Sequence, residues 1–100
     1  MRRLGCVALL LVLAAVALIW AVNDWRGAGP SGKAIGFRVA DGASLASTAR
    51  ALEKAGAIRS ARRFRYGARF LGSDAALKAG EYRLPARASA AAILRLIQSG

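Results

Sequence analysis

The stretch SLASTARALEKAGAIRSARRFRYGARFLG, residues 44–72, contains the same pair of helix signals twice in succession. Each copy opens on a serine, Ser44 or Ser60, whose hydroxyl can accept a hydrogen bond from a free backbone N–H of the first helical turn. Each copy closes on a glycine, Gly56 or Gly72, a residue that readily adopts the left-handed conformation found after a helix. The stretch therefore predicts two short helices joined by a tight connection.

Both predicted helices, over residues 45–55 and 61–71, have one apolar and one polar face at helical periodicity. The apolar stripes consist of Leu45, Ala49 and Leu52 in the first helix and of Ala61, Phe64, Ala68 and Leu71 in the second. The opposite face of the second helix carries Arg62, Arg65, Tyr66 and Arg69. Gly67 lies in the middle of this helix and should weaken it by about 1 kcal/mol relative to Ala. We expect the apolar stripes to face a core and the arginines to face water.

A short strand is predicted on each side of the two helices. In the first, the apolar residues Ile35, Phe37 and Val39 occupy alternate positions, which is the period of a half-buried strand. The second, GEYRL at residues 80–84, alternates in the same way and stops at Pro85, which cannot donate a hydrogen bond to a sheet. The order around residues 44–72 is therefore strand, helix, helix, strand.

A last helix is predicted after Ser89, another serine at an N-cap position. Its apolar stripe consists of Ala90, Ile93, Leu94 and Ile97. The whole is an α+β unit of about 65 residues, and a unit of that size buries only about 60% of the surface that its unfolded chain exposes. We expect marginal stability, and a partner for the apolar stripe of the last helix.

An apolar segment, LGCVALLLVLAAVALIWAV at residues 4–22, precedes this unit. At about 1.5 Å per residue it spans about 28 Å, close to the roughly 30 Å of bilayer hydrocarbon. Arg2 and Arg3 favour a cytoplasmic N-terminus, and Trp20 and Trp25 are placed where an outer aromatic belt would lie. We therefore predict a single-pass membrane protein whose C-terminal part lies outside the cytoplasm.

A cleaved signal peptide is the alternative for this segment. Its apolar region is usually about 7 to 15 residues long and ends at a small-residue cleavage site. Here the apolar run continues past Ala15 and Ala17, which favours a permanent anchor. We assign residues 1–22 to a cytoplasmic tip and transmembrane anchor, the Gly-, Pro- and Ser-rich residues 23–33 to a linker, and residues 34–100 to a small extracytoplasmic module.

The composition restricts the chemistry that the chain can perform. With no His and one Cys among 100 residues, the chain holds neither a Ser–His triad nor the ligands of a zinc, haem or iron–sulfur site. Nothing around Lys33, Lys54 or Lys78 indicates a pocket for pyridoxal phosphate. We expect no metal and no cofactor.

The formal net charge is +11, and Arg2 and Arg3 contribute only two of these charges. A basic domain favours anionic partners. The candidate contact residues are Arg62, Arg65, Tyr66 and Arg69. They suit anionic lipid headgroups, the carboxylates and sugar rings of peptidoglycan, or nucleic acid. We expect no nucleic acid outside the cytoplasm, and a solvated helix face without a dedicated ligand is the simplest alternative.

Four short motifs occur in order behind the apolar segment. They are DGAS at residues 41–44, AIRS at 57–60, LKAGEYRL at 77–84 and SAAAILRLIQSG at 89–100. This ordered set resembles the start of the bacterial endolytic murein transglycosylases, the MltG or YceG-like family, which is sometimes labelled aminodeoxychorismate lyase. The latter activity would require pyridoxal phosphate, so that label does not suit this chain.

The resemblance implies a transmembrane helix at the bacterial inner membrane, followed by a small LysM-like module. It also implies a catalytic domain with an essential Glu that begins beyond Gly100. The complete protein would then be a lytic transglycosylase that cleaves peptidoglycan strands during cell-wall assembly, together with cell-wall synthesis proteins. In that case these 100 residues anchor the enzyme and contact the wall without catalysing. Two alternatives remain open: a stand-alone membrane-tethered glycan-binding module and a membrane-bound nucleic-acid binder.

Glu81 is the carboxylate of the LKAGEYRL motif. A lytic transglycosylase needs one carboxyl group that serves first as acid and then as base, with a pKa raised by an apolar cleft. Glu81 instead alternates with Arg83 on the expected polar face of a strand, and it matches no catalytic position of the family. The other carboxylates, also expected in solvated positions, are Asp24, Asp41, Glu53 and Asp74. We predict no catalytic residue in the chain.

Overall fold

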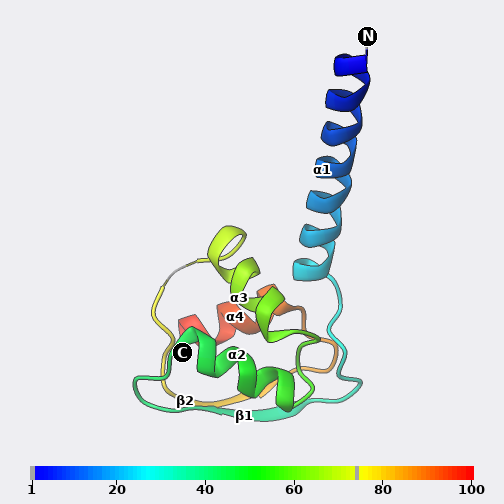
Figure 1. The fold of residues 1–100 in the computed structure, drawn as a ribbon. Helices are drawn as coiled ribbons and strands as arrows, with labels where there is room; N and C mark the ends of the chain where they lie inside the picture. Colours follow the sequence, from blue (N-terminus) through cyan, green and yellow to red (C-terminus); the bar gives the residue numbers. More distant parts are fainter. Residues whose placement is uncertain (1, 74) are drawn as a thin grey trace.

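The chain is an α+β protein in which a long N-terminal helix leads into a small domain (Figure 1). The computed structural model describes residues 2–73 and 75–100, and Asp74 lies outside them. Within the described residues the elements are α1 (Arg2–Arg26), β1 (Ile35–Val39), α2 (Leu45–Lys54), α3 (Ala61–Phe70), β2 (Gly80–Leu84) and α4 (Ala90–Ser99). This order confirms the predicted sequence of strands and helices, and the ends of α2 and α3 agree with the prediction to within one residue.

Serine hydroxyls cap α2, α3 and α4 as the sequence predicts. Ser44, Ser60 and Ser89 accept hydrogen bonds from the backbone N–H groups of Ser47 at 3.1 Å, Arg63 at 3.2 Å and Ala92 at 3.0 Å. After α2 the chain turns at Gly56 with a φ of 81°, a backbone conformation that glycine adopts without steric cost. Capping thus fixes where the helices begin, and glycine fixes where α2 ends.

The strands β1 and β2 pair antiparallel, with Phe37 opposite Tyr82 and Arg38 opposite Glu81. Helices α2, α3 and α4 lie over one face of this sheet (Figure 1). Leu84 on that face is 1% exposed, whereas Arg38 and Glu81 on the other face are exposed. The predicted alternation of buried and solvated strand residues is therefore confirmed.

The core lies between the covered face of the sheet and the helices. Its buried apolar side chains are Trp25, Val39, Ala49, Leu52, Ala57, Ile58, Ala61, Phe64, Ala68, Leu84, Ile93, Leu94 and Ile97. The apolar stripe of α4 packs against α1, α3 and β2 of the same chain. The expectation that this stripe needs a separate partner was therefore wrong, because the helices and β2 already cover Ile93, Leu94 and Ile97.

The end of α1 is part of this core. The helix continues four residues past Val22, and Trp25 is 5% exposed, with its ring centroid 5.6 Å from that of Phe64. A Cβ atom on Gly67 would overlap the indole of Trp25, which explains why a weak helix former occupies the middle of α3. Trp25 is therefore a core residue, and its placement in an outer aromatic belt was wrong.

The segment after α1 is fastened to the domain by hydrogen bonds. The backbone N–H of Gly29 donates to the carbonyl of Arg87 at 3.0 Å, and the N–H of Arg87 donates to the carbonyl of Ser31 at 2.8 Å. The guanidinium of Arg59 donates to the carbonyl of Ala28 at 3.1 Å. This Gly- and Pro-containing segment, which we assigned to a linker, thus packs along the domain surface.

Candidate functional site

The four residues singled out in the sequence share the outer side of α3. Arg62, Arg65, Tyr66 and Arg69 are all exposed, and we call them the outer face of α3. The opposite side of the helix is buried through Ala61, Phe64 and Ala68. Leu71 was expected on the buried side but is 37% exposed, because α3 ends at Phe70 and Leu71 forms its C-cap.

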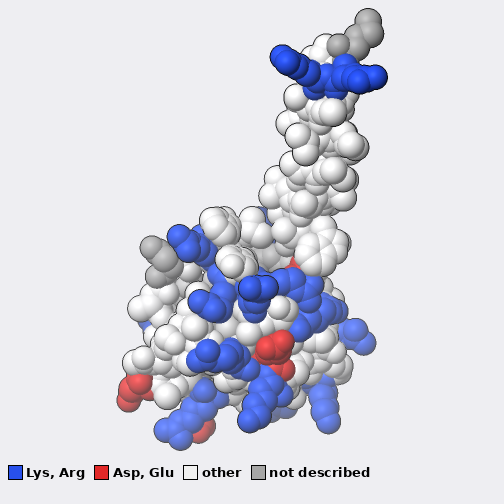
Figure 2. All heavy atoms as spheres, in the orientation of Figure 1, with Lys and Arg blue, Asp and Glu red and all other residues white. Residues whose placement is uncertain are grey.

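The outer face of α3 borders a wide, open groove between α2 and α3. Its arginines line one side, and Arg50 and Glu53 of α2 line the other. The groove is open to solvent, and its charged side chains are four arginines and one glutamate, so it is suited to contact carboxylate or phosphate groups rather than to enclose a small ligand. Figure 2 shows basic side chains spread over the domain, in contrast to the uncharged surface along most of α1.

Aromatic rings extend this face toward the C-terminal end of α3. The rings of Tyr66 and Phe70 stack with centroids 6.4 Å apart and planes inclined by 15°. The guanidinium carbon of Arg69 lies 5.6 Å from the centroid of Phe70. Phe70 is 71% exposed, and it was not among the contact residues predicted from the sequence.

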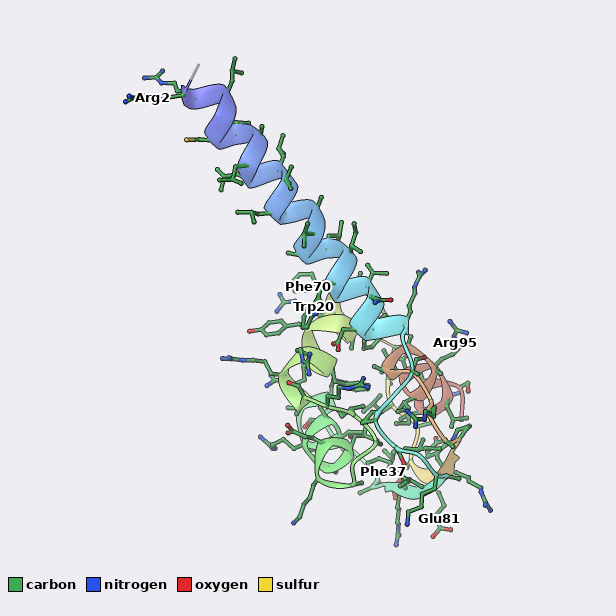
Figure 3. The ribbon with its side chains drawn as sticks, turned by 90° about the vertical axis from the view of Figure 1, so that its right-hand side faces the viewer. Arg2, Trp20, Phe37, Phe70, Glu81 and Arg95 are labelled. Atoms are coloured by element: carbon green, nitrogen blue, oxygen red, sulfur yellow. The ribbon has the colours of Figure 1, made fainter. Side chains whose placement is uncertain are left out.

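A cleft of about 200 Å³ separates this end of α3 from α1. Trp20 lines the cleft from α1, and Tyr66, Phe70 and Leu71 line it from α3. Figure 3 shows Trp20 and Phe70 beside each other where α1 leaves the domain. This proximity of α1 and α3 was not predicted, because no local sequence pattern relates residues so far apart along the chain.

An ion pair lines the same cleft. The Nη1 atom of Arg63 lies 3.2 Å from Oδ1 of Asp24, and its guanidinium carbon lies 5.3 Å from the centroid of Trp20. Arg63 thus contacts two residues of α1 at once. It joins α3 to α1 just beyond the apolar segment of the helix.

The other described carboxylates are exposed to solvent. Asp41 and Glu53 are exposed, and Glu81 points into solvent at the end of the domain opposite the N-terminus of α1 (Figure 3). Among residues 2–73 and 75–100, no three His, Cys, Asp or Glu side chains are grouped closely enough to hold a metal ion. Glu81 is exposed and lies opposite Arg38 in the sheet, whereas a catalytic acid of a transglycosylase requires an apolar cleft.

The helix α1 is long and apolar enough to cross a membrane. Its large side chains, from Leu4 to Trp20, are exposed rather than covered by the domain. In water this exposure would be costly, at about 25 cal/mol for each Å² of apolar surface. The helix is therefore a candidate membrane span, which agrees with the prediction from the apolar run.

Comparison with known proteins places the domain in a family. The model of the YceG-like family matches residues 37–100, from the middle of β1 through α4. Neither the comparison with curated proteins nor the comparison with solved structures gave a match. The family match includes all four residues of the outer face of α3 and covers more than half of the sequence. The chain therefore belongs to the YceG-like family.

Proposed function

We propose that this chain is the membrane-anchored N-terminal portion of a lytic transglycosylase that cleaves peptidoglycan strands during cell-wall assembly. The family match over residues 37–100 carries this proposal. The role of the portion is to hold the enzyme at the membrane and to contact the wall. The cleavage itself belongs to a domain outside residues 1–100, and this division of labour is supported by the solvated positions of Asp41, Glu53 and Glu81.

The proposed location is the bacterial inner membrane, with α1 as a single span. Arg2 and Arg3 precede the apolar part of α1, and such residues favour the cytoplasmic side. The domain then lies outside the cytoplasm, where peptidoglycan and the enzymes that synthesise it are available as partners. The lipid bilayer is a further partner, besides peptidoglycan and the synthetic enzymes. We propose neither a cofactor nor a nucleic-acid partner.

We further propose that residues 34–100 form a LysM-like, wall-contacting module. The strand, helix, helix, strand order and the antiparallel pairing of β1 with β2 support this assignment. Within the module, the outer face of α3 is the proposed contact. Its arginines suit the carboxylates of the peptide stems, and the ring of Tyr66 suits the apolar face of a sugar.

Two measurements on the full chain test this function. A reporter that works only outside the cytoplasm, fused after Gly100, should be active in cells, and the same reporter fused before Arg2 should be inactive. The detergent-solubilised chain should sediment with purified sacculi and should release no anhydromuropeptides. An active N-terminal fusion would refute the orientation, a chain that stays in the supernatant would refute wall contact, and released anhydromuropeptides would refute the non-catalytic role.

A further inference from the structure

We propose that the C-terminal end of α3 docks on the outer leaflet of the membrane that α1 crosses. The docking surface consists of Trp20, Tyr66, Phe70 and Leu71, which we call the aromatic surface. Its partner is the boundary between phospholipid headgroups and acyl chains. This inference rests on the proposed membrane anchoring and adds to it a fixed orientation of the domain.

The exposure of apolar side chains is concentrated at this one place in the domain. Outside α1, the exposed large hydrophobic side chains of the described residues are Tyr66, Phe70 and Leu71, which are 54%, 71% and 37% exposed. Tyr66 and Phe70 are about one helical turn apart and Leu71 follows Phe70, so the three are grouped at the end of α3 rather than scattered. Grouped exposure of this kind marks an interaction surface.

The depth of the aromatic surface follows from the cleft that it shares with α1. Tyr66, Phe70 and Leu71 line the same cleft as Leu18 and Trp20. The apolar segment of α1 ends at Val22, so Trp20 lies at its outer end. Figure 1 shows the C-terminal end of α3 pointing to the same side of the domain as α1. Insertion of α1 therefore brings these rings to the interface, the depth that Trp and Tyr favour.

Contacts between the last turn of α1 and the domain hold the aromatic surface near this depth. Trp25 is buried against Phe64, and Asp24 pairs with Arg63 at 3.2 Å. Because these contacts lie on the last turn of α1, they keep the domain beside the outer end of the helix, and the aromatic surface sets its orientation there. A span that crosses the membrane therefore presents the end of α3 to the outer leaflet.

The charge around the aromatic surface suits lipid rather than a second protein chain. Arg63 lies against Trp20 and Arg69 lies against Phe70, at 5.3 and 5.6 Å from the ring centroids. Arginines beside interfacial rings can reach the phosphate groups of the headgroups while their apolar stems stay among the acyl chains. Two copies of the chain joined through this surface would instead bring like charges together.

Paramagnetic broadening in lipid nanodiscs tests the proposal on the full chain. The nanodiscs would contain phosphatidylcholine and phosphatidylglycerol, with and without a lipid that carries a nitroxide on its headgroup. We expect the amide signals of Phe70 and Leu71 to lose intensity when the nitroxide is present. The signals of residues 80–84 should keep their intensity, because β2 lies at the opposite end of the domain.

A triple variant supplies the comparison. Tyr66→Ser, Phe70→Ser and Leu71→Ser together should abolish the intensity loss on residues 66–71, whereas the control Arg83→Gln on β2 should retain it. These three side chains are already solvent-exposed, so the dispersed amide spectrum of the fold should survive the change. Unchanged broadening in a folded triple variant would overturn the proposal.

Lipids that carry a nitroxide on the acyl chain test the anchoring of α1 separately from the docking of α3. If they fail to broaden residues 8–16 of α1, the proposed anchoring is refuted together with the docking. If they broaden those residues while the headgroup nitroxide leaves Phe70 unaffected, anchoring stands and docking is refuted. If the signals of Phe70 shift only as the protein concentration rises, the surface binds a second copy, and docking is refuted as well.

Discussion

At the scale of single residues, Gly67 shows that a residue with poor helix propensity can be required by the packing around it. A glycine costs a helix about 1 kcal/mol relative to alanine, so helix propensity alone predicts that Gly67→Ala stabilises the protein. Overlap of the new Cβ with the buried indole of Trp25 opposes this gain, and overpacking of a core typically costs about 1–3 kcal/mol. Because the indole is buried against Phe64 of α3, we expect the cost of the overlap to exceed the gain in helix propensity.

We therefore expect Gly67→Ala to lower the free energy of unfolding. Urea unfolding of the chain in micelles, followed by circular dichroism, measures the change. Gly36→Ala on β1 is the matched control, since a Cβ atom there meets nothing within 4 Å. A Gly67→Ala protein more stable than the wild type would show that Trp25 can move aside.

Glu81→Gln is a second prediction at this scale. Glu81 is exposed on the outer face of the sheet, where a charge-to-amide change should alter stability by less than about 0.5 kcal/mol. In the complete transglycosylase that we propose, the same change should leave the release of anhydromuropeptides nearly unchanged. Loss of that activity, with wild-type thermal stability, would identify Glu81 as a catalytic residue after all.

At the scale of elements, the two faces of α3 have different roles: the inner side packs in the core, and the outer face is free to bind a partner. Its inner side is buried through Phe64 and Ala68, whereas Arg62, Arg65 and Arg69 extend into solvent. Substitutions on the outer face should therefore change binding and leave the fold intact. A helix of this length is only marginally stable alone, so α3 is held in place by the packing of its inner side.

We predict that the triple variant Arg62→Gln, Arg65→Gln and Arg69→Gln unfolds at nearly the wild-type urea concentration. Its binding to sacculi and to anionic vesicles should weaken, because three positive charges are removed from one face. Co-sedimentation at low and high salt measures the change. A control that removes the same charge elsewhere, Arg38→Gln, Arg83→Gln and Arg95→Gln, should bind more tightly than the α3 variant. Equal binding of the two would show that only net charge matters.

At the scale of the whole molecule, the membrane helix and the domain share one core. The last turn of α1 supplies Trp25, which contacts Phe64 and closes over Gly67. Where the anchor is cut should therefore decide whether the domain stays folded. A cut before Asn23 keeps the indole, and a cut after Arg26 removes it.

We predict that residues 23–100 fold in solution without membrane, whereas residues 27–100 unfold at a markedly lower urea concentration. Loss of a buried Trp typically costs about 3–5 kcal/mol, a large share of the roughly 5–15 kcal/mol that stabilises a small domain. Trp25→Ala in residues 23–100 is the control, and it should reproduce most of the loss. Equal unfolding midpoints for the two truncated chains would contradict the shared core.

The order of the elements and most of their ends could be predicted from the sequence, because the signals that set them are local. A serine hydroxyl reaches N–H groups within its own helical turn, as at Ser44 and Ser60, and strand alternation depends only on neighbouring residues. The same periodicity placed Arg62, Arg65, Tyr66 and Arg69 on one exposed face. The length of the apolar run likewise predicted that α1 could cross a bilayer.

Only the tertiary structure decided which elements cover one another. Helical periodicity identifies an apolar stripe, but it does not say whether that stripe meets the same chain, a membrane or a partner. The stripe of α4 proved to be covered by its own chain, Trp25 belongs to the core, and Trp20 meets Phe70 beside the outer end of α1. These outcomes depend on contacts between residues distant along the chain, and such contacts are set by packing in three dimensions rather than by any local pattern.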